Sequence, residues 1–133
     1  MPFAGINYLA VLVAAIAGFA LGAGWYGALG KQWMAAAKVT RADLSTSKTV
    51  FLIAAICQLV MAFLLAGVMG HLGRVDVAGG LTIAFFLWLG FVATSMTVNH
   101  RFQGKGWALT AIDGGHWLAV LLVQGAIIGA MGV

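Results

Sequence analysis

The sequence predicts an all-α integral membrane protein that folds as one bundle of four transmembrane helices. Two observations predict this class: 63% of the 133 residues are hydrophobic, and only 8% are charged. Soluble domains are roughly half apolar and about a quarter charged, and a chain of this length has too little interior to bury so much apolar surface. Lipid removes the need to bury it, so residues 1–133 are expected to form a single membrane domain.

Four apolar segments are long enough to cross the hydrocarbon layer as helices. They cover residues 7–29, 49–70, 77–98 and 107–131. Helices are expected because unpaired backbone groups are costly in lipid, and because none of the segments alternates as a strand does. The first segment lacks a preceding Lys or Arg and is longer than the core of a signal peptide, so it is expected to remain as a span.

The connection between the first two spans is expected to contain a short interfacial helix. Residues 31–39 mix Trp33 and Met34 with alanines and lysines, a composition that suits a helix lying at headgroup depth. Ser45 or Ser47 is expected to cap the second span.

The basic residues predict the orientation of the bundle. Six of the seven lie in or beside the first and third connections and one lies in the second: Lys31, Lys38, Arg41, Lys48, Arg101 and Lys105, against Arg74. The positive-inside rule therefore places the first and third connections in the cytoplasm and both termini outside. Because the basic residues follow the topology and do not share one face, nucleic acid is not an expected partner.

Small and polar residues indicate how the spans pack. Gly18 and Gly22 share a stripe on the first span, and Gly125 and Gly129 form a second Gly-x-x-x-Gly on the fourth. Such faces let helix backbones approach closely in lipid, so they are expected to pack against another helix or a second protomer, and a homo-oligomer is predicted. Gln58, near the middle of the second span, is expected to point inward.

The fourth span is the most informative because its polar residues lie together. At helical spacing, Asp113, His116, Val120 and Gln124 fall within one narrow sector, which is expected to face the bundle interior. Asp113 lies inside the membrane near the cytoplasmic end, where a charged carboxylate needs a partner or must be protonated.

Side chains from other spans are expected to meet Asp113 at this depth. The predicted binding or proton-relay residues are Tyr26, Asn99, His100, Asp113 and His116. Such a cluster can relay protons, bind a cation or hold a polar headgroup. The alternative is structural: Asp113 pairs with Arg101 or Lys105 and, with His116, ties the third and fourth spans together.

Several kinds of chemistry are not indicated. The chain has no H-x-x-x-H or C-x-x-C spacing and basic connections that repel cations, so neither a metal site nor another cofactor is expected. No serine elbow or paired carboxylates accompany Asp113, so no catalytic residue is assigned, and an enzyme is the least favoured of the functions considered below.

Nearly the whole chain resembles the domain-of-unknown-function family 1761. The residues that carry the resemblance are Asn7-Tyr8, Trp25-Tyr26, Gly30-Lys31 with Trp33, the segment from Gly90-Phe91 to Asn99, and the polar start of the fourth span with His116. The resemblance implies a small four-helix protein of the bacterial cytoplasmic membrane and implies no particular activity.

Three functions are therefore considered. The first is the handling of a small molecule, ion or proton at the polar intramembrane site near the cytoplasmic side. The second is a structural or accessory subunit that binds a larger membrane complex, or itself, through glycine faces. The third is a membrane-embedded enzyme that modifies lipid, for which the sequence offers no nucleophile.

Overall fold

A computed structural model describes residues 3–132, and over these residues the chain is helical and contains no strand. Four helices are long and apolar enough to cross a membrane. The predicted all-α fold with four transmembrane helices is confirmed.

The helical elements succeed one another with short connections. They are α1 (Tyr8–Ala37), the 3₁₀ turn η1 (Arg41–Asp43), α2 (Lys48–His71), α3 (Val77–Leu87), the π-helical segment η2 (Trp88–Ala93), α4 (Thr94–Phe102) and α5 (Trp107–Met131). Because α3, η2 and α4 are joined without a break, they form one span, Val77–Phe102. Asn7, Ser47 and Asp76 cap α1, α2 and α3 through side-chain oxygens that accept backbone N–H groups.

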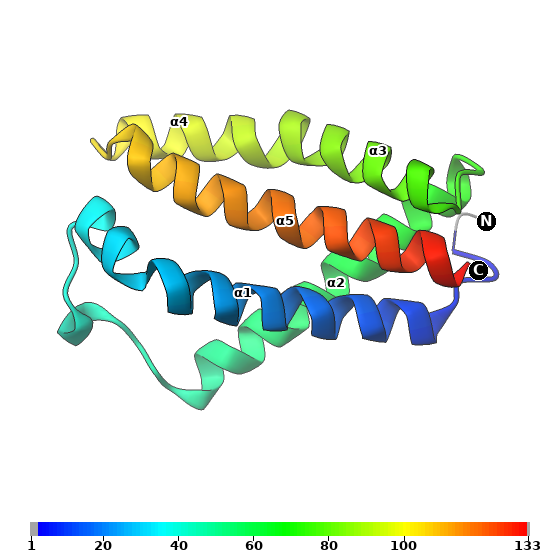
Figure 1. The fold of residues 1–133 in the computed structure, drawn as a ribbon, viewed down its shortest axis with the longest axis horizontal. Coiled ribbons are helices and arrows are strands. Elements are labelled where there is room, and N and C mark those ends of the chain that lie inside the picture. The colour runs from blue at the N-terminus through cyan, green and yellow to red at the C-terminus, as the bar shows by residue number, and fades with distance from the viewer. Residues whose placement is uncertain (1–2, 133) are drawn as a thin grey trace.

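Helix α5 occupies the centre of the bundle. It lies between α1 and the α3–α4 span, and α2 packs mainly against α1 (Figure 1). The start of α1, the end of α5 and the α2–α3 turn lie at one end of the bundle. Residues 38–47 and 103–106 lie at the other end, which we call the basic end because six of the seven basic residues are in or beside these connections.

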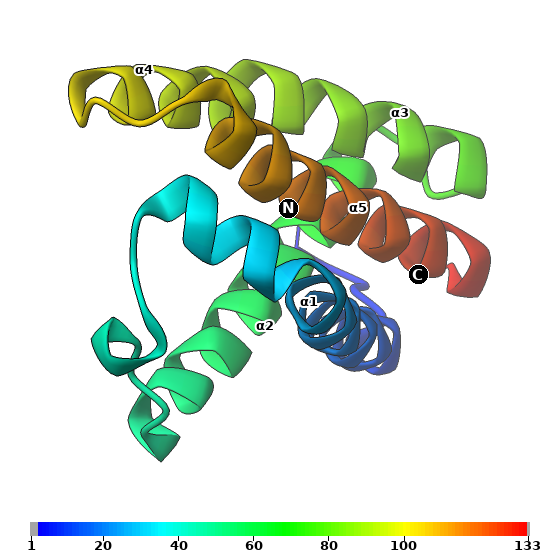
Figure 2. The same ribbon diagram turned by 60° about the vertical axis from the view of Figure 1, so that its left-hand side comes forward.

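Helix α1 is longer than the span that hydropathy predicts. The sequence predicts a crossing over residues 7–29 and a short separate helix over residues 31–39, whereas α1 is continuous from Tyr8 to Ala37. The short helix is therefore the last part of α1, and Figure 2 shows that this part bends away from the axis of the preceding turns.

Helices α3 and α5 approach each other through glycine. A Cβ atom on Gly80 would overlap the backbone of Gly125, and one on Gly125 would overlap the backbone of Gly80. Gly129 lies equally close to the backbone of Asp76. Since no hydrophobic force drives helices together in lipid, this close backbone approach gains van der Waals contact that larger residues would prevent.

Glycines of α1 leave room for polar side chains inside the bundle. Gly18 faces the buried amides of Gln58 and Gln124, which are joined by a hydrogen bond of 2.8 Å from Gln124 Nε2 to Gln58 Oε1. Gly22 faces the imidazole of His116. Gln58 points inward as predicted, and the four glycines expected at helix contacts all face residues of their own chain.

The π-helical segment changes which residues of the third span face the bundle. The sequence places Trp88, Ser95 and Asn99 on one stripe, but a π turn holds more residues than an α turn and rotates the rest of the span. In the structure Ser95 and Asn99 are exposed, whereas Met96 and His100 are partly buried. Hydroxyl groups of Thr94, Ser95 and Thr97 donate to carbonyl oxygens four residues earlier, within or at the end of the π segment.

We expect Gly80→Leu to destabilise the protein, because its side chain would force α3 and α5 apart, and overpacking of this kind costs about 1 to 3 kcal/mol. The matched control is Gly24→Leu, at a helical glycine with no atom within 4 Å of an added Cβ. Thermal unfolding in detergent, followed by circular dichroism, measures both. Equal unfolding midpoints for the two variants would contradict the close α3–α5 contact.

Candidate functional site

The carboxylate of Asp113 is the centre of the candidate site. The Tyr26 hydroxyl donates to Asp113 Oδ1 at 2.6 Å, and the Trp33 indole Nε1 donates to the same oxygen at 3.0 Å. The Asp113 side chain is 19% exposed, so it lies at the edge of the interior. Two strong donors on one oxygen stabilise the carboxylate at this depth without placing a positive charge beside it.

The continuous helix α1 explains why both donors reach Asp113. Tyr26, Gly30 and Trp33 lie at i, i+4 and i+7 on one face. The glycine between the two aromatic rings lines the same pocket as they do. The rings of Tyr26 and Trp33 meet edge to face, with centroids 6.1 Å apart.

His100 approaches the other carboxylate oxygen. Its Nε2 lies 3.9 Å from Asp113 Oδ2, and its Nδ1 lies 2.8 Å from Thr110 Oγ1. Arg101 Nη2 donates to the same Thr110 oxygen at 2.7 Å, which leaves the hydroxyl proton available for His100 Nδ1. His100 is therefore tied to Thr110 through Nδ1 while its Nε2 faces Asp113.

The basic side chains nearest Asp113 have other partners. Besides Thr110, Arg101 donates to the Gly106 carbonyl at 2.9 Å, and its guanidinium lies 3.7 Å from the centre of the Trp107 ring. Lys105 Nζ donates at 2.8 Å to the carbonyl of Ala37, at the end of α1. The alternative in which Asp113 pairs with Arg101 or Lys105 therefore does not match the contacts of the described residues.

His116 and Asn99 make no hydrogen bond to Asp113, and they lie in different environments. The His116 imidazole is buried, with its ring 4.8 Å from that of Tyr26 and 4.4 Å from that of Trp117. Its Nδ1 has no hydrogen-bond partner among the described residues. Asn99 is exposed on α4. The structure thus brings Tyr26, His100 and Asp113 together, packs His116 at a tilt against Tyr26, and leaves Asn99 outside the cluster.

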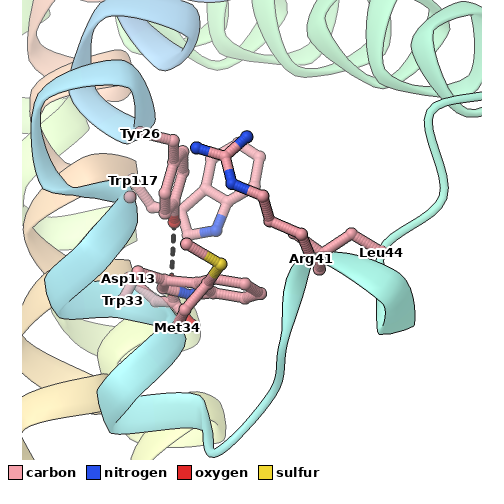
Figure 3. Close-up of a pocket in the computed structure, with 8 residues that line it drawn as sticks. Tyr26, Trp33, Met34, Arg41, Leu44, Asp113 and Trp117 are labelled. Carbon is pink, nitrogen blue, oxygen red and sulfur yellow. Dashed lines mark hydrogen bonds between the residues drawn. The ribbon is translucent and has the colours of Figure 1, made fainter.

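A pocket of about 460 Å³ opens beside Asp113 at the basic end. Figure 3 shows that α1 and α5 supply one wall and that the connection from α1 to α2 supplies the other. The lining residues are Tyr26, Gly30, Trp33, Met34, Arg41, Leu44, Asp113 and Trp117. The pocket therefore combines one carboxylate with three aromatic rings, and Arg41 extends from the loop toward Tyr26 and Trp117.

A compact turn holds the loop wall of this pocket. The backbone N–H of Thr40 donates to Asp43 Oδ2 at 2.8 Å, and its hydroxyl donates to the same oxygen at 3.1 Å. These hydrogen bonds, first the backbone one and then the hydroxyl one, hold the pKa of Asp43 below its ordinary value. The turn spans Arg41, so it fixes where the arginine leaves the loop.

Among the residues of the site with aromatic, hydroxyl or charged side chains, sequence reasoning missed Trp33, Thr110, Trp117 and Arg41. Trp33 and Trp117 had a usable signal, because they lie at helical spacing from Tyr26 and Asp113. Thr110 lies three residues before Asp113 and shares its face. Arg41 comes from a loop, where periodicity gives no signal.

The turn around Arg41 is expected to depend on pH. Because the folded pKa of Asp43 is lowered, its contribution to the turn is present above the ordinary carboxyl pKa and is lost as pH falls through the lowered value. The chemical shift of the Thr40 amide, measured by nuclear magnetic resonance as pH is varied, is expected to change with a midpoint below the ordinary carboxyl range. In Thr40→Val, which removes one donor, the midpoint should rise, with Thr46→Val as the control. An unchanged midpoint in Thr40→Val would contradict the hydroxyl contact.

Two further findings concern this site: the absence of a metal-ligand cluster among the described residues, and the family to which the chain is similar. Among the described residues, no group of three or more His, Cys, Asp or Glu side chains is placed to hold a metal ion. No curated protein and no solved structure matches the chain. The family model described as "Protein of unknown function (DUF1761)" matches residues 9–129, which is nearly the whole chain. The chain, with its carboxylate pocket between α1 and α5, therefore belongs to the DUF1761 family.

Proposed function

We propose that this membrane protein binds and handles a small molecule or ion in the pocket beside Asp113. The observation that carries the proposal is the combination of a pocket of about 460 Å³ with a carboxylate held by Tyr26 and Trp33 on its wall. Binding sites for small ligands have volumes of about 300 to 1,000 Å³ and few, well-placed polar groups among apolar ones. An ionisable side chain within a transmembrane segment supports function at that position.

The orientation belongs to the same proposal. Six of the seven basic residues are in or beside the connections at the basic end, so the positive-inside rule places the pocket mouth on the cytoplasmic side and both termini outside. With the resemblance to a bacterial family, this supports the bacterial cytoplasmic membrane as the location.

The two alternative functions have less support. An accessory subunit or homo-oligomer is the function that the glycine faces suggest, yet Gly18, Gly22, Gly125 and Gly129 face residues of their own chain. An enzyme that modifies lipid needs a nucleophile, and among the residues that line the pocket only Tyr26 and Asp113 are of a suitable type, with the two hydrogen-bonded to each other. The pocket is therefore assigned to binding, with no catalytic role proposed.

We expect Asp113→Asn to weaken solute binding about tenfold or more, because a hydrogen bond to a charged group contributes about 1.5 to 3 kcal/mol. The variant keeps an oxygen that can accept from Tyr26 and Trp33, so its fold should be retained, and circular dichroism checks this. The measurement is binding and vesicle flux across a panel of cationic, anionic and neutral solutes.

The matched control is Asp76→Asn, which changes an acid at the opposite end of the bundle. We expect it to bind and move every solute as the unmodified protein does. If binding and flux are the same in Asp113→Asn as in the unmodified protein for every solute of the panel, the proposed function is wrong.

A further inference from the structure

We propose that the ligand of this pocket is a small organic cation, an ammonium or guanidinium group that carries apolar substituents. The inference rests on the proposed function and names its ligand class. Asp113 provides the negative charge, and the rings of Tyr26, Trp33 and Trp117 provide aromatic surfaces for the cation.

Asp113 brings a negative charge to the pocket. It is the only acidic residue within a span, because the other two, Asp43 and Asp76, lie in the connections. Its two hydrogen bonds come from neutral donors and both reach Oδ1. Oδ2 has His100 Nε2 at 3.9 Å as its nearest basic group. Among the described residues no lysine or arginine forms an ion pair with Asp113, and such a carboxylate at this depth favours a ligand that brings a positive charge.

The aromatic lining of the pocket suits an organic cation. Cations are attracted to aromatic faces within about 6 Å of the ring centre, and the attraction grows when water is excluded. Tyr26 and Trp33 meet edge to face at an interplanar angle of 82°, and both donate to Asp113, so aromatic surface and carboxylate lie together in the pocket. Met34 and Leu44 add apolar surface for the substituents of an organic cation.

Arg41 places a positive charge of the chain itself in the pocket. The chain directs a guanidinium of its own toward Tyr26 and Trp117 (Figure 3). The Arg41 side chain makes no hydrogen bond or ion pair with any residue between 3 and 132. Within that part of the chain, its position in the pocket therefore depends only on its loop and on the pocket walls. Because Arg41 lines the same pocket as these rings, its positive charge would compete with that of a cationic ligand.

The test is calorimetric titration of the full-length protein in detergent micelles with three probes. These are tetraethylammonium as the cation, benzenesulfonate as the anion and benzyl alcohol as the neutral molecule. We expect tetraethylammonium to bind. Its affinity should fall at least tenfold in Asp113→Asn and several-fold in Trp117→Leu, and it should rise several-fold in Arg41→Gln.

Matched controls separate the pocket from general charge effects. Asp76→Asn and Arg74→Gln change the same residue types at the opposite end of the bundle and should leave the affinity unchanged. Arg41→Gln changes an exposed loop residue, so it keeps the test informative if Asp113→Asn unfolds.

The titrations can overturn the cation ligand in the following ways. Tetraethylammonium that binds equally well to Asp113→Asn, or more weakly to Arg41→Gln, overturns it. Binding of benzenesulfonate or benzyl alcohol without tetraethylammonium, when that binding is lost in Asp113→Asn, overturns the cation class and leaves the proposed function in place. The proposed function fails by a separate result, in which Asp113→Asn changes the binding and flux of no solute.

Discussion

The need to satisfy polar groups at the start of α5 fixes how the basic end of the bundle is built. Three consecutive residues each accept an indole N–H: the Ile112 carbonyl from Trp25, Asp113 Oδ1 from Trp33, and the Gly114 carbonyl from Trp88. An unpaired carboxylate or indole at membrane depth costs several kcal/mol. Helix α1 and the α3–α4 span must therefore dock on α5 at the height that lets these donors reach it, and the pocket lies beside the same contacts.

The sequence was sufficient for the fold and for the face of α5 that carries the site. Hydropathy alone separates the four spans, and helical spacing alone groups Asp113 with His116 and Gln124, of which the last two are buried. Trp33 was missed because the polar residues Lys31 and Gln32 suggest that the first span ends before them. Those side chains are exposed at the end of a helix that continues, so the spacing from Tyr26 to Trp33 is maintained.

His100 and Asn99 show where periodicity fails for a different reason. Both end the same span, and a regular α-helix counted from Trp88 brings Asn99 to the inner face. The π turn at Trp88–Ala93 shifts the register by about one residue, so His100 faces Asp113 instead. Hydrogen-bonding side chains such as those of Thr94 and Ser95 are compatible with a regular helix as well, so the sequence does not identify the π turn.

The contacts of Arg101 also bear on whether Asp113 is structural or functional. If the carboxylate were needed to hold α4 to α5, the nearest arginine would pair with it, since a buried ion pair loses stability when one partner is missing. Instead Arg101 joins Thr110, Gly106 and Trp107, and this set ties the α4–α5 turn together without the acid. The α4–α5 turn is therefore held by contacts that do not include Asp113, while Arg101 Nε and Nη1 are buried without a hydrogen-bond partner among the described residues.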